Sequence, residues 1–71
     1  MTKLPPLTGK RVIAALSKIS YKAVRQKGSH IRLQCPEKTS ITVPNHIIGI
    51  GLLRKILRDA DLTPEEFIKL L

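Results

Sequence analysis

Apolar residues recur every three to four positions in the first part of the chain, which predicts an amphipathic helix over residues 9–19. The hydroxyl of Thr8 can cap the start of this helix, and Leu7, just before the cap, can pack against Val12. The apolar side of the predicted helix consists of Val12, Ile13, Leu16 and Ile19.

From Tyr21 onward the pattern changes to the alternation typical of β-strands, which predicts strands over residues 21–26, 31–35 and 40–43. Lys27-Gly28-Ser29 has the composition of a tight hairpin turn, and residues 36–39 form a second turn. The apolar positions of the middle strand are Ile31, Leu33 and Cys35. Because side chains alternate along a strand, the intervening polar residues should face away from the core: His30, Arg32 and Gln34.

The second half of the chain returns to helical spacing. Pro44-Asn45-His46 ends the third strand, and we expect a loop that continues through Gly51. A second helix begins at Leu52 and extends to about Ala60, and its polar side carries Arg54, Lys55 and Arg58. Thr63-Pro64-Glu65-Glu66 predicts the start of a short third helix, with a cap, a proline at the first position and a glutamate at the third. We expect three apolar residues to fold back onto the core: Phe67, Leu70 and Leu71.

These elements predict an α+β fold of the order α-β-β-β-α(-α). Its three-stranded antiparallel sheet would carry the helices packed on one face. The length of 71 residues fits a single domain, residues 1–71, with a small core.

The charge of the chain indicates what kind of partner it binds. Thirteen lysines and arginines stand against five acids, so the formal net charge is +8, which favours nucleic acid. Aromatic residues make up only 3%, which argues against a platform for stacking bases. The single cysteine, Cys35, cannot form an internal disulfide, and without a His/Cys cluster we expect no metal or cofactor. No apolar run has membrane-spanning length, so we expect a cytoplasmic protein.

His30 is the first candidate for chemistry because it follows a glycine turn and lies among cations. Histidine can both take and give a proton near neutral pH. In RNA cleavage by internal attack the substrate's own 2′-hydroxyl is the nucleophile, so the protein need supply only proton transfer and charge stabilisation. The residues that we expect to contact RNA are Lys22, Arg25, Lys27, Ser29 and Arg32.

Each candidate also has a purely structural interpretation. His30 could be an ordinary exposed residue at the start of a strand, and Ser29 is better explained by turn chemistry than as a nucleophile. His46 could be a loop residue or a second proton carrier. The cations of the second helix could form a solvated face, or a surface for RNA or a partner.

Three stretches together resemble the HicA toxins of bacterial and archaeal toxin–antitoxin pairs: YKAVRQKGSHIR (21–32), VPNH (43–46) and GLLRKILRDADLTPEEFIKLL (51–71). The resemblance implies a small mRNA interferase with a fold similar to the double-stranded-RNA-binding domain. It implies that His30 is the catalytic residue and that His46 has a structural or accessory role. It also implies a HicB-like antitoxin partner that masks the active surface.

The chain departs from the family pattern at both ends of its second helix. Gly51-Leu52 replaces the usual Gly-Thr, which removes a capping hydroxyl. Ala60-Asp61 replaces a frequent Ala-Gly, and aspartate adopts a left-handed turn less readily than glycine. Both departures bear on helix boundaries more than on activity.

The sequence therefore predicts the toxin of a toxin–antitoxin system, a metal-independent endoribonuclease that cleaves mRNA and arrests translation and growth. Two alternatives stay open: a non-catalytic RNA-binding module, and a basic interaction protein that docks an acidic partner.

Overall fold

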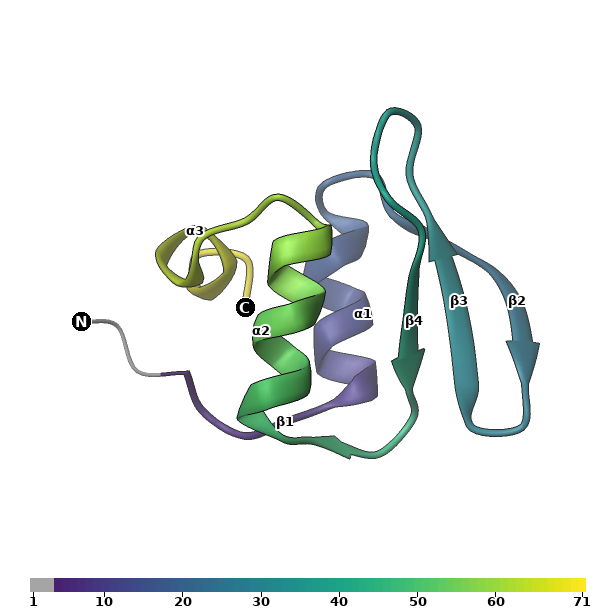
Figure 1. Ribbon diagram of the computed structural model, residues 1–71, viewed down its shortest axis with the longest axis horizontal. Helices are drawn as coiled ribbons and strands as arrows, with labels where there is room; N and C mark the ends of the chain where they lie inside the picture. Colours follow the sequence, from purple (N-terminus) through teal and green to yellow (C-terminus); the bar gives the residue numbers. More distant parts are fainter. Residues whose placement is uncertain (1–3) are drawn as a thin grey trace.

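Two helices lie on one face of a three-stranded antiparallel sheet in the computed structural model, which describes residues 4–71 (Figure 1). The predicted α+β class, similar to the double-stranded-RNA-binding domain, is therefore confirmed. The first three residues of the predicted 1–71 domain lie outside the described residues. The elements of the two layers are the helices α1 (Gly9–Ser17) and α2 (Ile50–Asp59) and the strands β2 (Lys22–Lys27), β3 (His30–Gln34) and β4 (Ile41–Pro44).

Helix α1 begins where the sequence predicts and ends two residues early. The Thr8 hydroxyl accepts a hydrogen bond from the Arg11 backbone N–H at 3.3 Å, so the expected cap is present. The helix stops because Ser20 has a left-handed φ of 79°. The Leu16 carbonyl then accepts from both the Ile19 N–H at 3.0 Å and the Tyr21 N–H at 3.2 Å, and the chain turns into the sheet.

The core lies between the helix layer and the sheet. Leu33 and Val43 of the sheet are fully buried, and they face Leu16 of α1 and Leu53 of α2 in one apolar cluster. Both aromatic rings of the chain, Tyr21 and Phe67, are buried, so neither is available to stack on a base. The Tyr21 hydroxyl donates to the Thr39 carbonyl at 2.9 Å. Burial raises the pKa of Tyr21, and the nearby Cys35 and Asp59 raise it further.

Helix α3 (Pro64–Ile68) packs beside α2, away from the sheet (Figure 1). The predicted capping box is confirmed: the Thr63 hydroxyl accepts from the Glu66 N–H at 3.1 Å, and a Glu66 carboxylate oxygen accepts from the Thr63 N–H at 3.0 Å. The bonds from Thr63 hold the pKa of Glu66 below its usual range. Phe67 is buried and Leu70 half-buried, as expected, whereas the expectation for Leu71 was wrong because its side chain is exposed.

The segment predicted as a loop from Pro44 to Gly51 contains two regular elements. Strand β5 (Ile47–Ile48) pairs antiparallel with β1 (Leu7–Thr8), and α2 begins at Ile50 rather than at Leu52. Gly49 is the N-cap residue of α2 and makes no side-chain capping bond. At the other end of α2, Asp61 has a φ of 59°, so the left-handed turn is kept although glycine is absent.

Gly9 allows the start of α1 to lie directly against the end of β4. Its N–H donates to the His46 carbonyl at 2.9 Å. A Cβ at this position would overlap the Pro44 carbonyl oxygen, so any larger residue would push the two segments apart. Glycine is therefore required here for space rather than for its backbone angles.

Among residues 4–71, no helix combines the length and apolar character needed to cross a membrane.

Candidate functional site

Six polar side chains of β2 and β3 share the face of the sheet that the helices leave uncovered. In the pairing of β2 with β3, Lys27 lies opposite His30, Arg25 opposite Arg32, and Lys22 opposite Gln34. Residues directly opposite each other in an antiparallel pair point to the same side of the sheet. Along β3 these residues alternate with the buried Leu33, so they point away from the core. We call this surface the outer face, and its residues are Lys22, Arg25, Lys27, His30, Arg32 and Gln34.

A β-bulge brings the cations of β2 onto this face. The register shifts between Ala23 and Arg25, so Val24 is an extra residue on β2. Under strict alternation Lys22 and Arg25 would point to opposite sides of the strand. With Val24 inserted, both point outward. No sequence pattern predicts this bulge, since Val24 fits an ordinary strand pattern.

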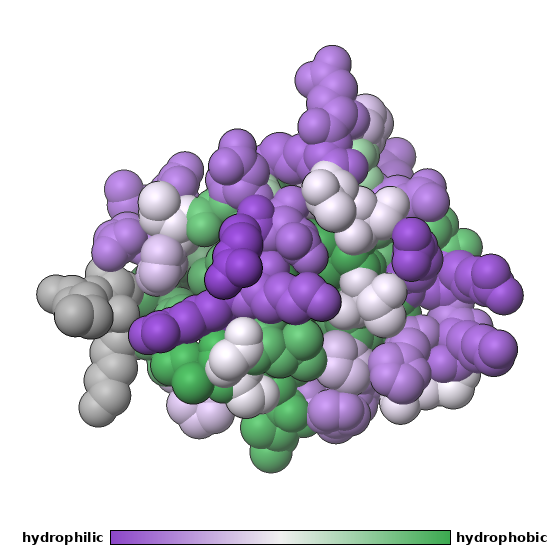
Figure 2. Space-filling model, viewed as in Figure 1, coloured by the Kyte–Doolittle hydropathy of each residue, from purple (hydrophilic) through white to green (hydrophobic). Residues whose placement is uncertain are grey.

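The outer face has positive charge that no described acid neutralises. Arg25 and Arg32 lie directly opposite each other, an arrangement that costs stability. Within residues 4–71, no ion pair is found at any of the four cations of this face, and all of them are exposed. Figure 2 shows hydrophilic side chains at the right of the molecule, where β2 and β3 lie in the view of Figure 1. This surface therefore favours the binding of an anion.

The turn between β2 and β3 places His30 as the first residue of its strand. The turn consists of Gly28 and Ser29, and Gly28 has a φ of 60°, a value that glycine adopts without strain. His30 is exposed, and its cross-strand neighbours are Lys27 on β2 and Pro44 on β4. The prediction that His30 lies outside the core is confirmed.

The loop after β4 is bonded to this turn on one side and to the start of α1 on the other. The Asn45 N–H donates to the Ser29 carbonyl at 2.6 Å, and the His46 carbonyl accepts from Gly9 as described above. The Nδ1 atom of His46 lies 2.9 Å from the Ile47 carbonyl oxygen. Because a carbonyl only accepts, this contact is a hydrogen bond when Nδ1 carries a proton, and Nε2 takes no part in it. Both histidines therefore lie at the same end of the sheet.

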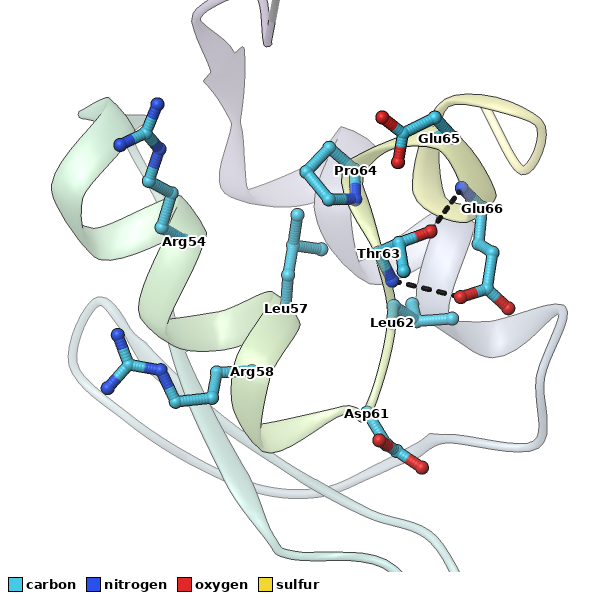
Figure 3. Close-up of a pocket in the computed structure, with 9 residues that line it drawn as sticks. All are labelled: Arg54, Leu57, Arg58, Asp61, Leu62, Thr63, Pro64, Glu65 and Glu66. Atoms are coloured by element: carbon cyan, nitrogen blue, oxygen red, sulfur yellow. Dashed lines mark hydrogen bonds between the residues drawn. The ribbon is translucent and has the colours of Figure 1, made fainter. Parts of the chain in front are cut away.

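The cations of α2 lie elsewhere. Arg54 and Arg58 line a groove of about 550 Å³ between α2 and α3, with Leu57 between them and Pro64 on the opposite wall (Figure 3). Since α2 covers the inner side of the sheet, this groove is separate from the outer face (Figure 1). A second hollow, of about 430 Å³, does reach the outer face, at the end remote from His30. Sequence reasoning found neither hollow, because each depends on tertiary packing.

Metal ligands are not clustered in the part of the chain that the structure describes: no three His, Cys, Asp or Glu residues there are placed to hold an ion.

A family model described as the HicA toxin of bacterial toxin–antitoxin systems matches residues 9–62 of the 71. The match includes the whole outer face, the hairpin turn and both histidines, whereas α3 lies beyond it. A comparison with curated proteins finds no match.

Proposed function

We propose that this chain, which belongs to the HicA family of toxins from bacterial toxin–antitoxin systems, acts in the cytoplasm by cleaving mRNA and so arrests translation and growth. One observation carries the proposal: an exposed histidine lies at the edge of a cationic face, and no acidic residue among residues 4–71 pairs with the cations of that face. Phosphate groups would supply the missing negative charge, and the histidine would supply proton transfer.

The reaction that suits this site is internal transesterification. His30 takes the proton of the substrate's 2′-hydroxyl, and the 2′-oxygen attacks the adjacent phosphorus. The bond to the 5′-oxygen breaks, which leaves a 2′,3′-cyclic phosphate on one fragment and a 5′-hydroxyl on the other. The leaving 5′-oxygen needs a proton, and His46, once protonated at Nε2, is the second candidate to give it.

The cations have distinct places in this scheme. Lys27 is the direct cross-strand neighbour of His30, and we assign it to the phosphate that is cut. Arg25 and Arg32 form the next pair along the sheet, and Lys22 stands beyond them, so these three would bind the neighbouring backbone. Ser29 lies in the turn directly before His30, and from this position it would contact the RNA.

Membership of the family implies an antitoxin partner, and we propose that this partner is HicB-like and covers the outer face. An acidic surface would match the unpaired cations there, and its binding would block RNA at the same residues. The neutralisation of this toxin would then be competitive with RNA.

The nature of the nucleophile gives a direct test. An RNA oligonucleotide with a single strong cleavage site would be compared with the same oligonucleotide carrying one 2′-deoxynucleotide on the 5′ side of the cut bond. Internal attack predicts that the single substitution abolishes cleavage at that bond and leaves other sites unaffected. Continued cleavage at the substituted bond would show that water or a protein group attacks instead. Binding of both oligonucleotides without any cleavage would favour the alternative of a non-catalytic RNA-binding module.

A further inference from the structure

The second hollow lies on the same surface as His30, at the other end of the strands. It has a volume of about 430 Å³. Its lining combines three apolar or weakly polar side chains with three that can form hydrogen bonds or carry charge: Val24, Cys35 and Pro36 with Lys22, Gln34 and Ser40. Apolar side chains combined with a few polar groups are typical of the lining of small-ligand sites.

Gln34 is the amide side chain that lines this hollow, beside the ammonium group of Lys22 and the hydroxyl of Ser40. Its side chain is exposed, and its amide makes no hydrogen bond to any other residue in the range 4–71. An amide offers one donor and one acceptor side by side. Adenine presents N7 and the N6 amino group in the complementary order, so a glutamine can hold its edge with two hydrogen bonds.

The spacing along β3 connects the hollow to the cut site. His30, Arg32 and Gln34 are successive outward residues of one strand, so His30 and Gln34 are about 13 Å apart, four residues at roughly 3.3 Å each. The Arg25–Arg32 pair lies between them. A single strand bound along this line would place one phosphate at His30, the next on the arginines, and a base in the hollow.

We infer that this hollow is a base-binding subsite that selects adenine at a position removed from the cut bond. The inference rests on the proposed ribonuclease function and adds to it the origin of sequence preference. The β-bulge serves both parts, since it turns Arg25 outward and leaves Val24, with 53% of its surface exposed, to line the hollow.

The test is to map cleavage positions in an RNA pool with a randomised region, using the purified full chain, and to compare base frequencies around the cut. The wild-type protein should show enrichment of adenine at one position that is not adjacent to the cut bond. Gln34→Ala should still cleave but lose at least about fivefold in discrimination at that position, the lower end for a two-bond amide contact to a base. Gln34→Glu, which can only accept, should shift the preference toward cytosine, whose N4 amino group donates.

Gln26→Ala is the matched control, because Gln26 is the other glutamine of the chain and lies outside the hollow, where its amide donates to the Gly28 carbonyl. It should retain the adenine enrichment even if the rate changes. Cleavage by both Gln34 variants with wild-type base frequencies would overturn the subsite and leave the ribonuclease intact. Absence of cleavage by the folded wild-type protein would instead overturn the proposed function, and the subsite with it.

Discussion

Replacing Arg25 with glutamate should stabilise the fold and weaken RNA binding at the same time. Arg25 lies directly opposite Arg32, and no described acid compensates the pair. Like charges at such a position destabilise a sheet by roughly 0.2–1 kcal/mol, and opposite charges stabilise it by a similar amount. The swing from repulsion to attraction is therefore about 1 kcal/mol. For a chain of this size that raises the melting temperature by about 4–8 °C.

The assay is thermal unfolding at low and high salt, with RNA affinity measured in the same buffers. The gain in melting temperature should shrink at about 1 M salt, where the screening length falls to about 3 Å. RNA affinity should drop, and the slope of log affinity against log salt should decrease in magnitude by about 0.7 or more, because at least one phosphate contact is lost.

Lys55→Glu is the matched control for this variant. It makes the same change in net charge at an exposed position on α2, away from the outer face. It should alter RNA affinity much less and should not reproduce the salt-dependent stabilisation. The reasoning is refuted if Arg25→Glu melts below the wild-type protein at low salt, or if its RNA affinity equals that of Lys55→Glu.

Three further outcomes follow from the fold. Gly9→Ala should lower the free energy of unfolding by about 1–3 kcal/mol, because the added Cβ would overlap the backbone of Pro44. Gly51→Ala should be neutral or stabilising, because Gly51 lies in α2 and its Cβ would meet no other atom. Denaturant unfolding of both variants tests this difference. Asp61→Gly should be more stable than Asp61→Ala by about 1 kcal/mol, since both lose the same charge and only glycine relieves the left-handed φ; equal melting temperatures would contradict this. The lowered pKa of Glu66 gives stability that is present above the pKa of the unfolded chain and is lost as pH falls through the folded value; melting from pH 7 to pH 3 should show a smaller loss for Glu66→Gln.

Strand β3 shows why the position of the catalytic candidate could be predicted from sequence. Leu33 must be buried, and the period of two then sets the direction of His30 and Arg32 without any knowledge of the other strands. The capping signals of α1 and α3 were equally local, and both were found where predicted. Patterns of this kind depend only on residues a few positions apart.

The features that escaped prediction depend on distant parts of the chain. Strands β1 and β5 have two residues each, which is too short for a periodic pattern. They pair with each other although α1 and the whole three-stranded sheet lie between them in the sequence. The N-cap of α2 is Gly49, which has no side chain to form a capping bond. The usual capping residues that mark a helix start in a sequence are therefore absent before Ile50. The bulge at Val24 appears only when β2 is aligned with β3. That alignment is what gathers Lys22 and Arg25 on the face of His30.

Incubation of the purified protein and its His30→Ala variant with a long unstructured RNA in EDTA tests the central claim most directly. His30 is exposed, so the variant should fold like the wild-type protein, and a thermal melt of both proteins checks this. We predict that the wild-type protein fragments the RNA and that the variant leaves it intact on a denaturing gel. Equal fragmentation by both proteins would contradict the role of His30, and intact RNA with both folded proteins would contradict the ribonuclease itself.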